Sequence, residues 1–288
     1  MRESAADLIE RGETEVDIGP FSLWEQPNLK ELWDFRHLLF VLVRRNVFYR
    51  YRQSLLGPAW FVIDPLLKMG VFSLLLGGIA GLPSEGVPYP LFVYTAILPW
   101  TLFSSSASRS TGSLLNYIHI ISKVYFPRLL LPAAEVLTSL ADFAISFAIL
   151  IAMALAYGYV PTIRFLIIPL LLGIPMILGL GVGYIFAGSQ VRYRDVGSFV
   201  GYFLKFWEYL TPVAYSVTVI STRVPDWVIP LYQLNPMNPV VEGFRWIMVG
   251  AGRAPDWTLG VSLFVTVVVV IVGVYVFSRS EHSIIDWV

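Results

Sequence analysis

The 288-residue sequence contains no cysteine and only three histidines, His37, His119 and His282. The missing thiols exclude disulfide bonds, thiol catalysis and cysteine-ligated metals. The histidines are scattered and never take the H-E-x-x-H spacing of a zinc protease. Charged residues make up 14% of the chain, against roughly 25% in soluble domains, and the formal net charge is zero. We therefore expect no metal site, and no basic field that would attract nucleic acid.

The sequence also lacks the short motifs that bind nucleotides or activate a nucleophile. It contains no G-x-x-x-x-G-K-[ST] P-loop, no glycine-rich dinucleotide fingerprint after a strand and no G-x-S-x-G elbow. The glycine-rich stretch 178–184 is better explained by small residues that let membrane helices approach closely. We therefore predict that the chain is not an enzyme, with no catalytic residue and no cofactor of its own.

Hydrophobic residues make up 56% of the chain and gather in long runs between residues 57 and 280. A helix needs about 20 predominantly apolar residues to cross roughly 30 Å of hydrocarbon. The runs predict an all-α polytopic membrane protein with a transmembrane domain over 57–280 and a short cytosolic tail over 281–288. The six predicted spanning helices cover residues 58–81, 90–108, 129–157, 163–188, 197–219 and 258–278.

Two chemically different segments precede the first run. Residues 1–29 are polar and acidic, the opposite of a signal peptide, so we expect a cytosolic arm and no cleavable signal. Residues 30–56 are basic and aromatic, and their longest uninterrupted apolar stretch, 38–43, is too short to span. Arginines attract anionic headgroups and aromatic rings settle at the headgroup level. The segment 30–56 is therefore predicted to form an amphipathic interfacial helix.

Lysines and arginines are distributed unevenly between the two sides of the predicted spans. Four lie on one side, Arg164, Arg223, Arg245 and Arg253. Fourteen lie on the other, namely Arg2, Arg11, Lys30, Arg36, Arg44, Arg45, Arg50, Arg52, Arg109, Lys123, Arg128, Arg192, Arg194 and Arg279. Because cytoplasmic loops carry the excess of positive residues, both termini are predicted to lie in the cytosol.

The segment 220–257 breaks the pattern of long apolar runs. It is too apolar for a solvated loop and is interrupted by Pro225, Pro230, Pro236, Pro239 and Pro255. We interpret it as two short re-entrant helices, with Asn238 as an N-cap and Pro239 at the first helical position. The alternative is a hairpin resting on the membrane surface. Non-helical backbone at membrane depth must be buried in protein or line a cavity, so re-entry predicts an outer gate formed by Asn235, Pro236, Asn238 and Pro239.

Ionisable residues inside predicted spans are costly enough to count as functional hypotheses. They are Asp64, Lys68, Glu135, Asp142, Lys205 and Glu208. The spacing of Asp64 and Lys68, and of Lys205 and Glu208, allows each couple to pair along its own helix. The charges either neutralise one another and hold spans one, three and five together or form a polar lining for a hydrophilic passenger. The sequence leaves both interpretations open.

Aromatic residues follow one face of the fifth predicted span. Phe199, Tyr202, Phe206 and Tyr209 have the i, i+3, i+7, i+10 spacing of a helical stripe. Such a stripe is usually packing, yet flat rings also suit the apolar faces of sugars. The substrate-pathway candidates are therefore Trp60, Asp64, Lys68, Phe199, Tyr202, Lys205, Phe206, Glu208 and Tyr209.

Three arginines of the interfacial segment share a helical side with His37. Arg44 and Arg45 lie seven or eight residues from Arg52 and from His37, so the spacing returns to nearly the same side. This face either anchors the helix among lipid headgroups or contacts another anionic group.

Five sequence motifs, in this order, carry a resemblance to a known family. They are RYRQSLLGPAW at 50–60, PLFVYTAILPW at 90–100, ISKVYFPRLLLP at 121–132, VRYRDV at 191–196 and LNPMNPVVEGFRW at 234–246. Together they resemble the permease subunit of the ABC-2 type exporters that move lipid-linked polysaccharides, including O-antigen and teichoic acid. The resemblance covers about residues 30–280.

The resemblance implies a homodimer in a bacterial inner membrane, assembled with two copies of a separate ATPase subunit that binds ATP and magnesium. The passenger would be a polyprenyl-diphosphate-linked polysaccharide, moved from the cytosol to the outer side. Contact with its diphosphate is then the alternative to headgroup anchoring for Arg44, Arg45 and Arg52. It also implies that residues 114–123 form a helix docking into the ATPase, although a plain interfacial loop is the alternative. The docking candidates are Asn116, Tyr117, Ile118, Ile120 and Lys123.

Three functions remain to be compared. The first is the export permease, with O-antigen, teichoic acid and capsule as passengers within it. The second is a membrane-embedded transferase, which would need a clustered carboxylate or histidine site that the sequence does not assemble. The third is an ion-coupled secondary transporter, supported only by Glu135 and Asp142.

Overall fold

The computed structural model describes residues 33–52, 59–118, 126–217, 225 and 227–284, and every regular element within them is helical. The α-helices are α3 (Arg36–Arg52), α4 (Trp60–Phe72), α5 (Tyr89–Asn116), α7 (Leu130–Ala156), α8 (Ile168–Arg192), α9 (Val196–Leu210), α11 (Val228–Gln233), α12 (Met237–Val249) and α13 (Trp257–Ile284). A π-helix, Ser73–Ile79, continues α4, and a short 3-10 helix, Ile163–Ile167, leads into α8. The predicted acidic arm, 1–29, lies outside the described residues.

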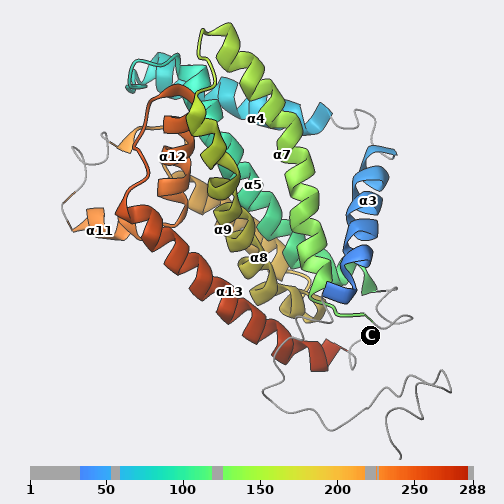
Figure 1. The fold of residues 1–288 in the computed structure, drawn as a ribbon. Helices are drawn as coiled ribbons and strands as arrows, with labels where there is room; N and C mark the ends of the chain where they lie inside the picture. The colour runs from blue at the N-terminus through green and yellow to red at the C-terminus, as the bar shows by residue number, and fades with distance from the viewer. Residues whose placement is uncertain (1–32, 53–58, 119–125, 218–224, 226, 285–288) are drawn as a thin grey trace, which may run out of the picture.

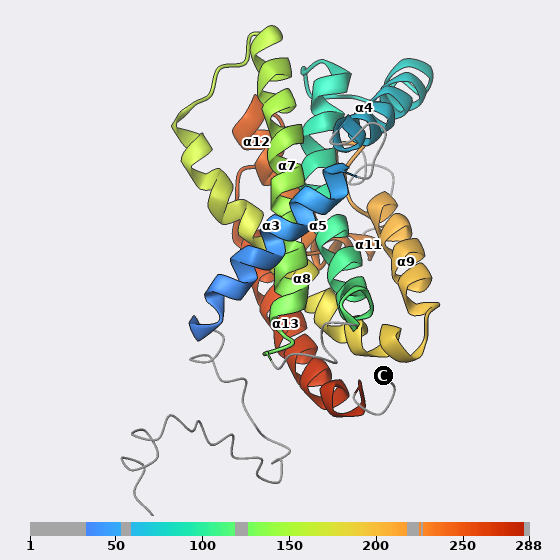
Figure 2. The ribbon, with the colours of Figure 1, turned by 90° about the vertical axis from the view of Figure 1, so that its right-hand side faces the viewer.

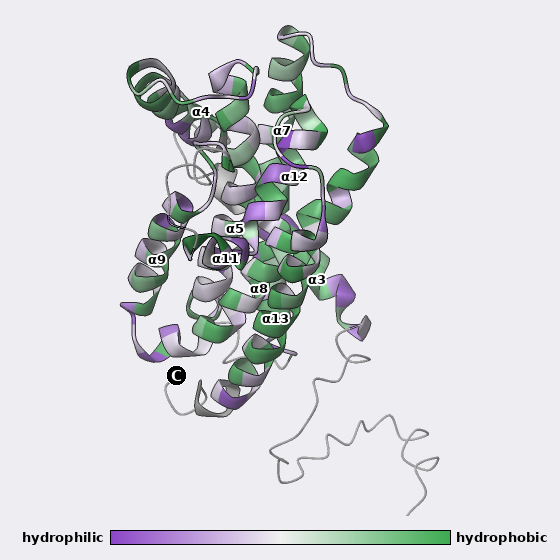
Figure 3. Ribbon diagram, turned by 90° about the vertical axis from the view of Figure 1, so that its left-hand side faces the viewer, coloured by the Kyte–Doolittle hydropathy of each residue, from purple (hydrophilic) through white to green (hydrophobic). Residues whose placement is uncertain are grey.

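Four helical segments within the described residues are long and apolar enough to cross a membrane. They cover Val62–Ile79, Leu130–Ala156, Ile163–Arg192 and Trp257–Ser280. Figure 3 shows this apolar character directly, since α13 is hydrophobic along most of its length. The prediction of a multi-pass all-α membrane protein is therefore confirmed. Four of the six predicted spans correspond to these segments, and the other two stay predictions.

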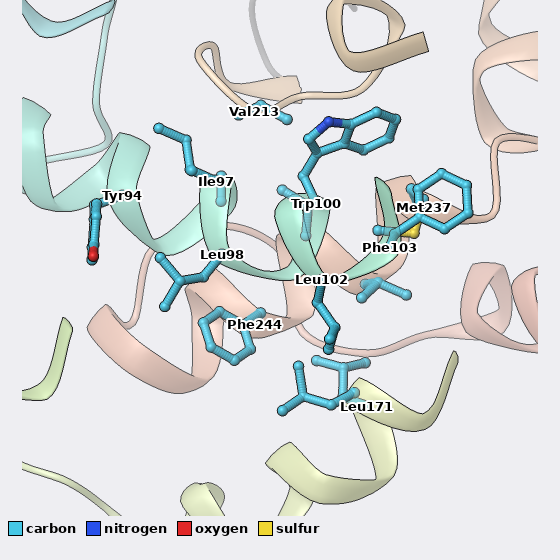
Figure 4. Packing of buried hydrophobic residues seen from close by; sticks show 14 of the residues in the cluster. Tyr94, Ile97, Leu98, Trp100, Leu102, Phe103, Leu171, Val213, Met237 and Phe244 are labelled. Carbon is cyan, nitrogen blue, oxygen red and sulfur yellow. The ribbon is translucent and has the colours of Figure 1, made fainter. Parts of the chain in front are cut away.

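Helix α5 forms the centre of the bundle (Figure 1). Its first half is buried on all sides, from Leu91 to Trp100, and packs against α7, α8 and α12. Figure 4 shows rings and aliphatic chains of α5 meeting Leu171 of α8 and Phe244 of α12. Burial of so much apolar surface on every face makes α5 the element around which the others are positioned.

Glycines allow α8 to lie unusually close to its two neighbours. A Cβ atom added to Gly179 would lie 2.6 Å from the Ser106 Cβ of α5, and one on Gly183 would overlap Ser110. On the opposite face, a Cβ on Gly181 would lie 3.0 Å from Val269 of α13. The prediction that the stretch 178–184 serves close helix packing is confirmed, because only small residues fit between these backbones.

Helix α5 is longer than predicted, since it continues from residue 108 to Asn116. The added turns are rich in hydroxyl side chains. Those hydroxyls are satisfied inside the bundle: Thr111 donates to the Ala107 carbonyl at 2.8 Å, and Ser110 donates to the Pro132 carbonyl of α7 at 3.0 Å. Small side chains bonded to backbone carbonyls are compatible with a buried helix.

Helix α9 is shorter than the predicted span of 197–219, because it ends at Leu210. Proline disfavours a helical conformation at the residue before it, and Pro212 follows Thr211, whose backbone is extended. The side chain of Thr211 closes the last turn by donating to the Trp207 carbonyl at 3.1 Å.

The segment predicted to hold two short helices contains α11 and α12. The predicted N-cap is wrong by two residues: α12 begins at Met237 after Pro236, so Asn238 and Pro239 lie inside its first turn. Asn235 supplies a side-chain acceptor at the start of α12, because its Oδ1 accepts a hydrogen bond from the Met237 N–H at 3.0 Å. Nearly all of α12 is buried, against α5, α8 and α13.

Helix α3 packs beside α7 at the end of the bundle where α5 stops (Figure 1). Its Leu42 is buried in a cluster with Leu131 and Ala134 of α7, while Phe40 and Phe48 are exposed. One face of α3 thus packs against the bundle, and another face is exposed. An interfacial position of the open face stays a prediction.

Candidate functional site

Helices α4 and α9 lie on the same side of the bundle in two opposite views (Figures 2 and 3). An ion pair joins them: Lys68 Nζ lies 3.6 Å from Glu208 Oε1 and 3.9 Å from Asp64 Oδ2. The sequence expectation of an Asp64–Lys68 pair therefore agrees with the structure. The expected Lys205–Glu208 pair is wrong, because Glu208 turns to α4 and Lys205 lies over the Tyr202 ring, 5.7 Å from its centroid.

The predicted aromatic stripe of α9 faces outward. Tyr202 is 72% exposed, and Phe199, Phe206 and Tyr209 are also exposed. The other side of the helix packs onto α5, where Trp207 meets the rings of Trp100 and Phe103. Packing inside the chain thus accounts for Trp207. Phe199 also meets the Phe186 ring of α8, 6.1 Å away between centroids, whereas Tyr202, Phe206 and Tyr209 stay largely exposed.

The face formed by α4 and α9 combines apolar and charged groups. Trp60 of α4 is half exposed, and the side chain of Asp64 is 64% exposed. We call the pathway candidates at the surface of these two helices the α4–α9 face; it consists of Trp60, Asp64, Lys68, Phe199, Tyr202, Lys205, Phe206 and Tyr209. A carboxylate exposed on an otherwise apolar helix is costly in hydrocarbon, so this face suits contact with water or protein rather than lipid.

The predicted outer-gate residues connect α9 to α12. Asn235 accepts from Trp207 Nε1 at 3.0 Å and donates to Thr211 Oγ1 at 3.0 Å. The carbonyl of Pro236 accepts from Ser262 of α13 at 2.6 Å, and Asn238 donates to the Tyr232 carbonyl at 2.6 Å. The short segment between α11 and α12 is therefore hydrogen-bonded to the end of α9 on one side and to α13 on the other.

A buried arginine inside the predicted re-entrant segment holds this region together. Arg245 of α12 is completely buried, and its Nη1 donates to Glu242 Oε1 at 2.6 Å. Its Nη2 donates to the Pro212 carbonyl at 2.9 Å, and its guanidinium lies 3.7 Å from the centroid of the Phe92 ring. The i, i+3 spacing of Glu242 and Arg245 was the available sequence signal for this pair.

The second group that the sequence analysis missed is a polar ladder along α7. Arg109 of α5 pairs with Asp142 at 2.5 Å and donates to Ser139 at 3.3 Å. One turn further, Asn46 of α3 donates to Glu135 at 3.2 Å. Both buried carboxylates thus have partners, which weakens the only support for an ion-coupled transporter.

The structure places the ATPase-docking candidates at the end of α5. Asn116 is exposed and Ile118 half-buried, whereas Tyr117 is buried and donates its hydroxyl to Asn46 of α3. Tyr117 is therefore a link between helices rather than a free contact. Ile120 and Lys123 lie outside the described residues.

The predicted arginine face of α3 divides in two. Arg44 lies over the Phe48 ring at 5.6 Å, and Arg45 lies over the Tyr117 ring at 5.2 Å. Both arginines are exposed, but Arg45 contacts a residue that follows α5, whereas Arg44 contacts only its own helix in these ring interactions. The side chain of Arg52 lies outside the described residues.

Comparison with known proteins connects these features to a family. The family model described as ABC-2 type transporter matches residues 37–249. Separately, the residues that the structure describes hold no group of three or more acidic or histidine side chains that could bind a metal ion. The chain is 31% identical over 229 residues to "O-antigen export system permease protein RfbA" of Myxococcus xanthus, which covers 79% of this chain and 86% of the relative.

Two further relatives cover more of the chain at lower identity. A Klebsiella pneumoniae protein of the same name is 26% identical over 256 residues, 88% of this chain and 95% of the relative. "Polysialic acid transport protein KpsM" of Escherichia coli is 22% identical over 254 residues, 85% of this chain and 93% of the relative. All three matches extend over most of both proteins.

Proposed function

Because this chain belongs to the ABC-2 type transporter family, we propose that it exports a polyprenyl-diphosphate-linked polysaccharide, of the O-antigen kind, across a bacterial inner membrane. The chain is a permease, a transport subunit without an ATPase domain. ATP and magnesium are bound by a separate ATPase subunit in such systems. The observation that carries the choice of passenger is the resemblance to export permeases over at least 79% of the chain.

The α4–α9 face supports a homodimer with a passenger route at its centre. Charged Asp64 and the rings of α9 would otherwise face lipid, where an exposed carboxylate is expensive. A second copy of the chain would cover this face and enclose a path lined by both aromatic and charged groups. Two permease chains would then engage two ATPase subunits through Asn116, Ile118 and the segment up to residue 123.

Six membrane crossings and a re-entrant segment complete the proposed topology. Helix α5 has 28 residues, about 42 Å of helix, which exceeds the hydrocarbon thickness. Helix α9 has 15 residues, about 22 Å, so the crossing needs the chain that follows Leu210. The burial of α12 supports re-entry over a surface hairpin. Arg109 and Arg245 lie inside the bundle, so neither should be counted among the lysines and arginines that flank the membrane. Leaving out one residue from each side keeps the excess on the cytosolic side, which predicts cytosolic termini.

The proposed function is tested in inverted membrane vesicles that hold the chain alone or with its ATPase. We expect no ATP hydrolysis by the chain alone, and ATP-dependent uptake of lipid-linked glycan when both are present. Deleting the gene should make that glycan accumulate on the cytosolic side. Uptake driven by a proton gradient without ATP would contradict the proposal, as would a covalently altered glycan.

Single alanine substitutions at Tyr202, Phe206 and Tyr209 test the passenger route. An aromatic contact contributes about 1 kcal/mol, so each variant should export glycan about five-fold more slowly with ATPase assembly unchanged. Phe264 of α13, which is 69% exposed outside the α4–α9 face, supplies the control variant Phe264→Ala. Initial export rates in vesicles measure the effect, and full rates in all three variants would show that the stripe plays no part in transport.

A further inference from the structure

A cavity of about 220 Å³ lies between α4, α5 and α7, on the inner side of α4. One water needs only about 10–15 Å³ of such space, so the cavity has room for a small-molecule group. The cavity is distinct from the exposed rings of α9, none of which lines it. It shares Trp60 and Asp64 with the α4–α9 face, so the cavity lies beside the proposed glycan route.

Hydroxyl groups from two helices line the cavity. Thr101 and Ser105 contribute from α5, and Ser139 and Ser146 contribute from α7. The Thr101 hydroxyl is buried and has no hydrogen-bond partner among the described residues. An unsatisfied buried hydroxyl costs free energy, so a polar ligand or water would stabilise this arrangement.

The charges around the cavity balance each other. Asp142 is paired with Arg109 at 2.5 Å, and Asp64 has Lys68 at 3.9 Å. A phosphate would meet two carboxylates on the lining, whereas a divalent cation would find both carboxylates already paired. The electrostatics therefore favour an uncharged ligand that donates and accepts hydrogen bonds.

Aromatic groups complete the lining. Trp60 stands at the rim, half exposed, and Phe143 forms part of the buried wall. Specific small-molecule sites combine such apolar surfaces with a few placed polar groups. A pyranose ring matches this combination, because it has apolar C–H faces and a circumference of hydroxyls.

We propose that the cavity between α4, α5 and α7 is a binding subsite for one uncharged sugar unit of the passenger. The proposal rests on the export function given above and narrows it, because it selects a neutral glycan segment over a polyanionic one. Carboxylate and hydroxyl oxygens of the lining would hold the sugar hydroxyls, and Trp60 would cover one face of the ring.

The absence of native cysteine permits a direct test by thiol labelling. Ser105→Cys places a thiol in the cavity, and Ser104→Cys, one residue earlier and outside the lining, is the matched control. Both variants are labelled with an uncharged methanethiosulfonate reagent in the permease–ATPase complex in nanodiscs. A neutral glucose oligosaccharide should slow labelling of Ser105→Cys several-fold, while a sialic acid oligosaccharide of equal length should not. Neither should affect Ser104→Cys.

The subsite proposal would be overturned if both oligosaccharides protected the Ser105→Cys thiol equally, if neither protected it, or if the thiol never reacted. A second variant, Ser105→Leu, fills the cavity and should lower the export rate several-fold with ATPase assembly intact. Unchanged export by Ser105→Leu would also overturn it. Wild-type export is measured in the same vesicles, and loss of ATP dependence there would instead overturn the proposed function.

Discussion

Replacing Arg245 with methionine should destabilise the protein by about 3–5 kcal/mol, because it leaves Glu242 buried without its cation. The change also removes the donors to the carbonyls of Phe92 and Pro212. These bonds join α12 to α5 and to the chain that follows α9. We therefore expect loss of both the folded population and ATPase co-purification, measured by thermal unfolding and size-exclusion chromatography in detergent.

Arg253→Met is the matched control for this change. Arg253 also pairs with an acidic residue three positions away, Asp256 at 2.6 Å, but its side chain is 57% exposed. Exposed ion pairs contribute less than about 1 kcal/mol, so the control should stay close to wild type. The double variant Arg245→Met, Glu242→Leu should recover part of the loss, because no unpaired charge remains. A single variant as stable as the control would contradict the assigned role of Arg245.

Gly179→Val should produce the second large effect. Its added carbons would lie against Ser106 and the α5 backbone, where even a Cβ would be 3.0 Å from the Ala107 nitrogen. Overpacking of this kind costs typically about 1–3 kcal/mol, and backbone on the other side gives little room to relax. We expect a lower thermal midpoint and a smaller yield of membrane-inserted protein.

Gly173→Val tests whether this effect comes from packing rather than from the helix itself. Gly173 lies on the same helix, α8, and an added Cβ there meets nothing within 4 Å. Its variant should therefore insert and unfold like the wild type. If both valine variants behaved alike, the close approach of α5 and α8 would not be the cause.

The sequence predicted the elements whose residues show their environment locally. The apolar runs located four spans that the structure contains, and the glycine stretch predicted close packing of α8. The spacing of Tyr202, Phe206 and Tyr209 identified one helical face, and those rings are exposed together. Each of these features follows from hydrophobicity, residue size or helical period, which are properties of neighbouring residues in the chain.

The missed interactions depend on partners that are distant in sequence. Ending the second span at residue 108 placed Arg109 in a loop, and this hid its pairing with Asp142 on α7. The hydroxyl of neighbouring Ser110 likewise finds its acceptor, the Pro132 carbonyl, on another helix. Likewise the sequence spacing allowed Glu208 to pair with Lys205 on its own helix, whereas in the structure Glu208 forms an ion pair with Lys68 of α4. Local periodicity cannot rank such tertiary partners.

The glycine faces of α8 have a consequence for biosynthesis. One face meets α5, which is made earlier, but the other is completed by α13, where a Cβ on Gly273 would lie 2.5 Å from the Gly181 carbonyl. Helix α13 is the last of the described helices to be synthesised: it begins 65 residues after the end of α8 and runs to Ile284, so that face of α8 stays open in the bilayer until α13 has been made. During that interval any other helix with a small-residue face can pair with it. Correct assembly of the bundle therefore depends on α13 displacing such contacts from α8 once it enters the bilayer.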